Sequence, residues 1–172
     1  MTHLDKTAAS TASGPAREFA GEIREAQPQD YARIAELAGQ LSYPSSKDEI
    51  AKRFDGMKHS SEHAVFVAQV ASGEIAGWLA VFVYRVVEAD ARAEISGFVV
   101  DERHRSQRLG MHLLARAERW AREKGCRAIG LRSNVIRDRA HAFYESHGYR
   151  HVKTQKSFRK DLTDRSGKRR EG

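Results

Sequence analysis

The spacing of apolar positions predicts a short strand followed by a helix near the start of the chain. Residues 19–26 form the strand candidate. Residues 27–41 contain Pro28 and Asp30, which are typical of a helix start. Behind them, apolar residues recur three or four positions apart, as on one face of a helix. These residues are Tyr31, Ile34, Leu37, Ala38 and Leu41.

Residues 42–54 predict a second helix. Ser46 and Glu49 have the spacing of a capping box, in which each side chain binds the backbone N–H of the other residue. Ile50 and Phe54 are four positions apart and are expected to face the core together. Two short helices therefore precede the first long strand.

Three β-rich runs follow and predict an antiparallel meander. They cover residues 63–70, 73–87 and 91–100. The segment Ala71–Glu74, between the first two runs, is typical of a hairpin turn. The middle of the chain is therefore expected to supply the central strands of one sheet.

The rest of the chain alternates helices with strands. A strand over 127–135, a helix over 137–148 and a last strand over 149–162 complete the order βααβββαβαβ. Such alternation is typical of an α/β fold. A further helix lies between the strand at 91–100 and the strand at 127–135, and it is expected to end at Gly125. Its apolar face is predicted to hold Leu109, Leu113, Leu114, Ala117, Trp120 and Ala121.

Composition and charge narrow the function classes. The 172 residues fit one domain, and 40% of them are hydrophobic. The formal net charge is +7, but the stretch from Arg150 onward holds nine Lys or Arg against three Asp or Glu, so the rest is nearly neutral. Residues 163–172 are therefore expected to be a disordered basic tail, and no specific nucleic-acid site is expected.

The leader and the cysteine content suggest a cytoplasmic protein. Residues 1–17 have no apolar signal segment and are expected to be a disordered leader. The single cysteine, Cys126, excludes an internal disulfide. No apolar run reaches the roughly 18 residues of a membrane helix, so no membrane association is expected.

The turn between the strand at 91–100 and the following helix is the strongest candidate site. A strand that runs directly into a helix presents the first, unpaired N–H groups of that helix, which attract anions. Arg105, Gln107 and Arg108 add donors and positive charge suited to a pyrophosphate. The turn lacks the glycine patterns of a P-loop and of a Rossmann turn, so it favours neither nucleotide hydrolysis nor dinucleotide binding.

This turn resembles the acetyl-CoA signature of the GCN5-related N-acetyltransferases, Gln/Arg-x-x-Gly-x-Gly/Ala. The sequence RSQRLG places Arg105 at the first position and Gly110 at the last. Arg108 stands where the signature has glycine. If that position requires a positive φ, an arginine costs free energy or shifts the loop, and alternatively its side chain contributes a contact to phosphate.

A second motif supports the same resemblance. The sequence AFYESHGY, residues 142–149, is similar to the family's Phe-Tyr-x-x-x-Gly-Phe/Tyr, and Asn134 lies upstream where members often carry asparagine. The resemblance covers residues 18–162. It implies a mixed, mostly antiparallel central sheet flanked by helices on both faces.

The resemblance also implies acetyl-CoA as co-substrate, with no metal. Phe98, Val99 and Val100 would bind the pantetheine arm through their backbone, as an added strand would. The full set of cofactor-binding residues implied is Phe98, Val99, Val100, Arg105, Ser106, Gln107, Arg108, Leu109, Gly110, Met111, Asn134 and Tyr144.

Three residues of the later motif have alternative roles. Tyr144 falls where the family donates a proton to the CoA sulfur, and alternatively it packs the helix. Phe143 is interpreted as a core residue. Asn134 is either a turn residue or a CoA ligand.

Glu94 is the candidate general base. It precedes Gly110 by 16 positions, the spacing at which some protein-acetylating members carry their glutamate. Strand alternation places it on one face with Ser96 and Phe98, provided that no bulge intervenes. The alternatives are a solvated edge residue and a chain of water molecules as the base.

The sequence thus predicts a cytoplasmic N-acetyltransferase that moves an acetyl group directly to a primary amine. A small-molecule acceptor is favoured over a protein, and a homodimer is possible. The eight histidines show no metal-binding spacing and are interpreted as surface or packing residues. The alternative is an acyl-CoA-binding sensor, or a protein- or nucleic-acid-associated module that uses the basic tail.

Overall fold

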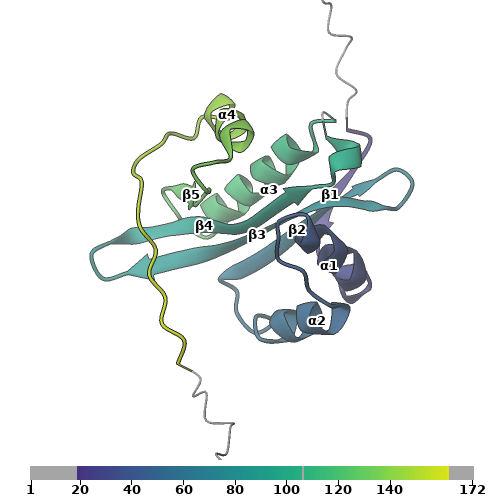
Figure 1. Cartoon of the computed structure of the whole chain (residues 1–172), viewed down its shortest axis with the longest axis horizontal. Helices are drawn as coiled ribbons and strands as arrows, with labels where there is room; N and C mark the ends of the chain where they lie inside the picture. Colours follow the sequence, from purple (N-terminus) through teal and green to yellow (C-terminus); the bar gives the residue numbers. More distant parts are fainter. Residues whose placement is uncertain (1–18, 106, 163–172) are drawn as a thin grey trace, which may run out of the picture. The chain divides into compact units, whose positions relative to one another are not determined.

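A computed structural model describes residues 19–105 and 107–162 (Figure 1). The chain divides into two compact units, with the boundary between Arg132 and Ser133. The first unit contains one five-stranded sheet in the order β1-β2-β3-β4-β5. Its strands are β1 (Gly21–Glu25), β2 (His63–Val70), β3 (Ile75–Val86), β4 (Ala89–Val100) and β5 (Ile129–Leu131). Its helices are η1 (Pro28–Asp30), α1 (Tyr31–Gly39), α2 (Lys47–Asp55), η2 (Glu102–His104) and α3 (Leu109–Glu123).

The sheet confirms the predicted meander. β1, β2, β3 and β4 pair antiparallel in chain order, whereas β5 pairs parallel with β4. The tight turn between β2 and β3 contains Gly73 at φ +87°, a conformation that glycine adopts without strain. The fold is therefore a mixed, mostly antiparallel sheet, as expected from the sequence.

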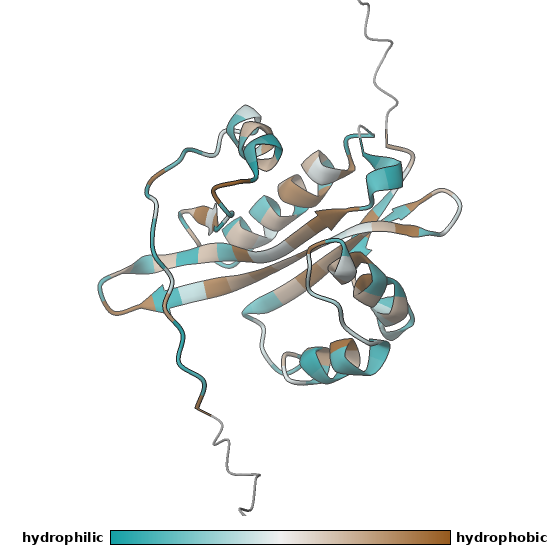
Figure 2. Cartoon of the chain, in the orientation of Figure 1, coloured by the Kyte–Doolittle hydropathy of each residue, from teal (hydrophilic) through white to brown (hydrophobic). Residues whose placement is uncertain are grey.

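Helices cover both faces of this sheet. α3 packs across β1 to β4 on one face, and all six residues predicted for its apolar face are buried. α1 contacts β3 and β4 on the other face, with α2 packed beside it (Figure 1). Figure 2 shows apolar residues concentrated along the middle strands. The core on the α1 side consists of Ile34, Ala35, Leu37, Ile50, Val67, Ile75 and Val99.

The capping box predicted for α2 is confirmed. The backbone N–H of Glu49 donates to Ser46 Oγ at 3.2 Å, and the backbone N–H of Ser46 donates to Glu49 Oε2 at 2.7 Å. Two of the otherwise unpaired donors at this end of the helix are thereby satisfied. The helix is therefore held at the position expected from its sequence.

A bulge in β4 changes which residues share a face. Gly97 pairs with Ala80 and Ile95 pairs with Val81, so Ser96 is the extra residue. Glu94 lies opposite Phe82 and Phe98 lies opposite Leu79. Because those two β3 residues are an odd number of positions apart, Glu94 and Phe98 lie on opposite faces. The bulge therefore breaks the grouping that uninterrupted alternation would give.

The predicted strand over residues 149–162 is wrong. This segment has no strand pairing, and from Arg150 onward all of its described side chains are exposed, including Val152, Phe158 and Leu162. Its charged residues fall at both odd and even positions, so it offers no continuous apolar face to bury. The predicted strand over 127–135 is also shorter, because only Ile129–Leu131 pair with β4.

The second unit contains α4 (Asp138–Ser146), which follows a turn. After α4, Gly148 adopts φ +84° and the backbone N–H of Tyr149 donates to the carbonyl oxygen of Tyr144 at 3.1 Å. The helix therefore ends close to where the sequence predicts. Among the described residues, no helix has the length and apolar character needed to cross a membrane.

Candidate active site

β5 covers only part of the β4 edge that faces it. β4 pairs with β5 only at Ala93, Glu94 and Ile95. Beyond the bulge at Ser96, no described strand pairs with this edge of β4. The residues predicted to bind the pantetheine arm, Phe98, Val99 and Val100, lie in this half of the strand.

This half of β4 leads into the turn before α3. Arg105 and Arg108 are exposed there, and Gln107 is half-buried. Ser106, also predicted to bind cofactor, lies outside the described residues. The guanidinium groups of both arginines are thus accessible to an anionic ligand at the end of β4.

Arg108 adopts the left-handed conformation, with φ +59° and ψ +7°. For a residue with a Cβ this conformation costs roughly 1–2 kcal/mol, because Cβ approaches the following carbonyl oxygen. The sequence left open whether this position needs a positive φ. In the structure this position does have a positive φ, so the arginine accepts the free-energy cost of the left-handed conformation.

The backbone donors in the first turn of α3 have no acceptor within the helix. Arg108 is its N-cap and provides no side-chain cap, while the N–H of His112 donates to the Arg108 carbonyl oxygen at 3.2 Å. The N–H groups of the preceding helical residues, Leu109, Gly110 and Met111, have no partner inside the helix. Because the Leu109 side chain is buried in the core, that residue can contact a ligand only through its backbone.

A charged cluster fixes the start of this turn. Asp101 follows β4 directly, is 1% exposed and accepts hydrogen bonds from the backbone N–H of Arg103 at 2.9 Å and from Arg103 Nη2 at 2.8 Å. Arg33 of α1 also donates to Asp101. Glu74, in the β2–β3 turn, pairs with Arg103 at 2.7 Å and with Arg33 at 3.1 Å. This cluster connects α1, the β2–β3 turn and the end of β4.

The cluster has a clear electrostatic consequence. The side-chain hydrogen bonds from Arg103 and Arg33 hold the pKa of Asp101 well below its usual range, although burial opposes this. Asp101 in turn raises the pKa of the Arg103 guanidinium. Both groups therefore remain charged at neutral pH.

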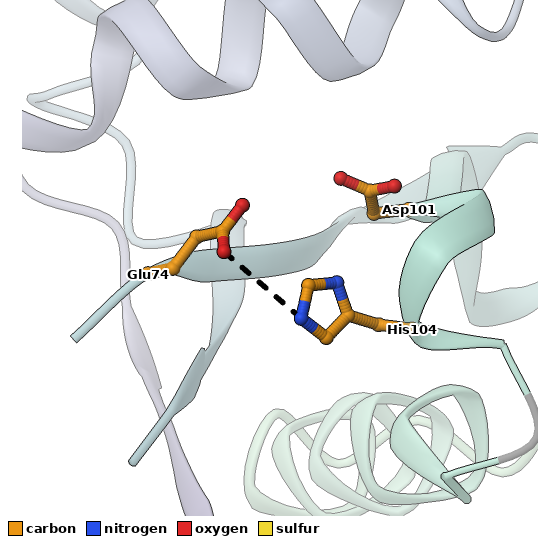
Figure 3. Close-up of side chains that lie close together, drawn as sticks. All are labelled: Glu74, Asp101 and His104. Atoms are coloured by element: carbon orange, nitrogen blue, oxygen red, sulfur yellow. Dashed lines mark ion pairs between the residues drawn. The ribbon is translucent and has the colours of Figure 1, made fainter. Parts of the chain in front are cut away.

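The same cluster brings three possible metal ligands together, Glu74, Asp101 and His104 (Figure 3). His104 Nε2 lies 4.0 Å from Glu74 Oε2. The two arginines, however, already occupy carboxylate oxygens of Glu74 and Asp101. A cation would have to displace both guanidinium groups, so this cluster is better suited to hold the turn than to bind a metal.

Glu94 is buried, with 6% exposure, and is held by arginines. Arg132 Nε donates to Glu94 Oε1 at 2.8 Å, and Arg92 Nε lies 3.5 Å from Glu94 Oε2. Through its register, Glu94 lies on the same sheet face as Trp78 and α1. The carboxylate is therefore paired with guanidinium groups on this face of the sheet.

A pocket of about 540 Å³ lies on this face. It is bordered by the connection between α1 and α2, by α2 and by β2, β3 and β4. Ser96 and Gly97 form its β4 side. The ring of Trp78 lies over Gly97, where an added Cβ would approach ring atoms to 2.5 Å. The absence of a side chain at Gly97 therefore allows the indole to lie against the strand.

Tyr144 lies in the second unit, on α4. Burial raises the pKa of its hydroxyl, and Arg137 opposes that shift. The phenol is therefore protonated at neutral pH. Its ring centroid lies 5.6 Å from that of Phe143 and 5.9 Å from that of Tyr149.

Asn134 acts as a turn residue before α4. Its Oδ1 accepts from the backbone N–H of Ile136 at 3.2 Å, and its carbonyl oxygen accepts from the backbone N–H of Arg137 at 3.0 Å. The turn role is thus observed, and the CoA role stays a prediction.

The geometry can be compared with known proteins. Residues 26–149 match the acetyltransferase (GNAT) family. The chain belongs to this family. GNAT enzymes use acetyl-CoA as co-substrate, and this chain is an N-acetyltransferase.

Two curated GNAT relatives cover most of the chain. It is 29% identical over 144 residues to aminoglycoside N(6')-acetyltransferase type 1 of Stenotrophomonas maltophilia, covering 81% of this chain and 93% of that protein. It is 32% identical over 136 residues to aminoalkylphosphonate N-acetyltransferase of Salmonella typhimurium, covering 75% and 84%. Glucosamine-6-phosphate N-acetyltransferase from Arabidopsis thaliana has a similar structure, with a TM-score of 0.72, 25% identity and coverage of 82% and 99%.

Sequence reasoning missed two features of this GNAT site. The charged cluster joins Arg33 to Asp101, 68 positions apart, and no local pattern indicates such a pair. A signal for Asp101 was present, because an acidic residue directly after a strand often caps the next turn. The bulge at Ser96 had only a weak signal, Gly97 beside it, because a glycine inside a strand can mark a bulge.

Proposed function

We propose that this enzyme transfers the acetyl group of acetyl-CoA directly to the primary amine of a small molecule bound in the pocket beside Ser96 and Gly97. The observation that carries this proposal is the part of the β4 edge beyond Ser96, with which β5 does not pair. It connects the uncapped N-terminus of α3 at one end with the pocket at the other. An arm bound along this edge would bring a thioester to the acceptor.

The co-substrate would bind mainly through the backbone. The first N–H groups of α3 and the exposed Arg105 and Arg108 suit the pyrophosphate. We assign the pantetheine amides to the backbone of Phe98, Val99 and Val100, which would bind them as an added strand would. We propose that four further residues also contact acetyl-CoA, namely Gln107, Met111, Asn134 and Tyr144.

The transfer itself needs few groups. The amine nitrogen attacks the thioester carbonyl carbon, the C–S bond breaks, and the thiolate takes a proton. We assign that proton to Tyr144, whose raised pKa keeps the phenol protonated at neutral pH. Glu94 would receive the proton lost by the amine through water, because it lies on the pocket's face of the sheet but does not line the pocket.

The names of the relatives leave the acceptor open. One relative acts on an aminoglycoside and another on an aminoalkylphosphonate. Both acceptors are small molecules with an amine, which supports a small acceptor for this chain. A cytoplasmic location and a homodimer stay predictions.

The proposal can be tested by measuring free thiol during incubation with acetyl-CoA and a panel of small primary amines. Release of CoA with matching N-acetylated product, identified by mass spectrometry, is the expected result. Binding of acetyl-CoA without transfer to any amine would instead support the sensor that the sequence left as an alternative.

A further inference from the structure

The proposed acceptor pocket lacks, in its described lining, the acidic side chains that a positively charged amine substrate would favour. Among the described residues that line it, none is Asp or Glu, and the only charged residue is Arg53. Most of the lining is apolar, including Leu41, Phe54, Met57 and Trp78. The pocket therefore has an apolar body and a positive rim.

Arg53 is available for an anion. It is exposed on α2, and its Nη1 donates to Ser45 Oγ at 2.8 Å. The charge of Arg53 also acts on the Glu49 carboxylate, and together with hydrogen bonds from Ser46, which act more strongly, it lowers the pKa of that group. Glu49, one turn earlier, is occupied with the backbone N–H and hydroxyl of Ser46. The guanidinium thus retains donors that could bind an anionic group in a bidentate manner.

Three buried or half-buried carboxylates outside the pocket lining are already paired with other arginines. Glu94 is held by Arg132 and Arg92. Glu74 and Asp101 are paired with Arg33 and Arg103. A ligand with several ammonium groups would therefore place them against apolar side chains and a guanidinium, without a free acidic partner.

We propose that the acceptor is a primary amine on an apolar body that also bears one anionic group, and that Arg53 binds this anion. This inference rests on the proposed function, since it specifies the substrate class of the same pocket. It disfavours polyamines and aminoglycosides as acceptors. Either a carboxylate or a phosphonate on the acceptor would supply the anion that Arg53 binds.

The test compares acceptors that differ only in the anion. We would measure kcat/KM for 4-(2-aminoethyl)benzoate, its methyl ester and the corresponding arylphosphonate, with kanamycin A as the polycation. Wild-type enzyme is expected to prefer the acid over the ester about ten-fold or more, the range of a charge-assisted hydrogen bond. The phosphonate arm shows which anion is preferred.

Two variants locate the effect. In Arg53→Gln, the ratio of kcat/KM for the acid over the ester should fall to about one. Lys52→Gln removes the same charge from the neighbouring exposed position, which does not line the pocket, and should keep the wild-type ratio. Melting curves of both variants establish that they are folded, and a ratio of two substrates is insensitive to a loss of folded protein.

Several results would overturn the inference. They are a wild-type enzyme that accepts the ester as well as the acid, a higher kcat/KM for kanamycin A, or an equal loss of preference in both variants. In each of these cases the proposed acetyl transfer to a small amine stands. If acetyl-CoA binds but no amine is acetylated, the proposed function fails and the inference fails with it.

Discussion

At the scale of single residues, Arg108 combines a strained backbone with an exposed charge. Replacing it with glycine should remove the roughly 1–2 kcal/mol cost of the left-handed conformation, offset by about 0.4–1 kcal/mol from the more flexible unfolded chain. Replacing it with alanine removes the guanidinium and keeps the Cβ. We therefore expect Arg108→Gly to be more stable than Arg108→Ala by about 1 kcal/mol in chemical denaturation.

The same pair of variants tests the role of the side chain. If the Arg108 guanidinium contacts the pyrophosphate, both variants should show a raised KM for acetyl-CoA and a weaker dependence of that KM on salt. A glycine variant that is less stable than the alanine variant would contradict the strain. An unchanged KM in both would remove Arg108 from the phosphate site.

Tyr144 is the second residue whose role can be isolated. Tyr144→Phe keeps the ring and its packing with Phe143 and Tyr149, so the melting temperature should change little. Loss of a general acid typically costs about 100-fold or more in rate, and we expect that loss in kcat where acetyl transfer limits turnover. A raised acceptor KM with kcat intact would show a binding role instead.

At the scale of elements, the sequence predicted the helices whose signals lie within a few consecutive residues. The six buried residues of α3 follow from a 3.6-residue period, and the capping box of α2 from the spacing of Ser46 and Glu49. The strand over 149–162 failed because β-propensity without an apolar face does not determine pairing. The bulge at Ser96 could not be predicted, because register depends on the partner strand.

The candidate site also has a part that the sequence predicts and a part that it does not. The turn from Arg105 to Gly110 was found from the sequence, because its residues are consecutive and its function depends on backbone donors. The pocket was not found, because its walls come from α1, α2 and three strands that only the fold brings together. The motifs thus predicted the residues proposed to bind the co-substrate, and the structure supplied the pocket proposed for the acceptor.

The charged cluster should connect elements energetically. Asp101→Asn removes a buried carboxylate from between Arg33 and Arg103, and we expect a loss of about 3 kcal/mol in the free energy of unfolding at neutral pH. Asp55→Asn is the matched control, since Asp55 pairs with Lys58 at the surface and should cost under about 1 kcal/mol. Equal losses in the two variants would contradict a special role for the cluster.

The pH dependence provides an independent check of this cluster. Because the pKa of Asp101 is depressed in the folded chain, the unfolded chain binds a proton first as the pH falls. The stabilisation is complete above the unfolded value of about 3.9 and is lost below it. The free energy of unfolding should therefore fall less steeply below about pH 4 in Asp101→Asn than in the wild type.

At the scale of the whole molecule, the basic tail should be dispensable for catalysis. Residues 163–172 lie outside the described part of the chain, and their composition is too polar to form a core. A chain that ends at Leu162 is expected to keep the wild-type kcat and KM for both substrates. Loss of activity in a truncated protein with an unchanged melting temperature would show that the tail contributes to the site.

Binding of acetyl-CoA should stabilise the folded molecule as a whole. A ligand at 100 times its Kd adds about 2.7 kcal/mol, which corresponds to a rise of roughly 5–11 °C in the melting temperature for a chain of this size. Gly110→Val places a β-branched side chain in the first turn of α3, at the proposed phosphate site. The variant should fold, and its shift with acetyl-CoA should be much smaller. Calorimetry that finds the same affinity for acetyl-CoA in Gly110→Val and in the wild type would move the co-substrate away from this turn, whereas a reduced affinity with an unchanged melting temperature of the free protein would support the proposed site.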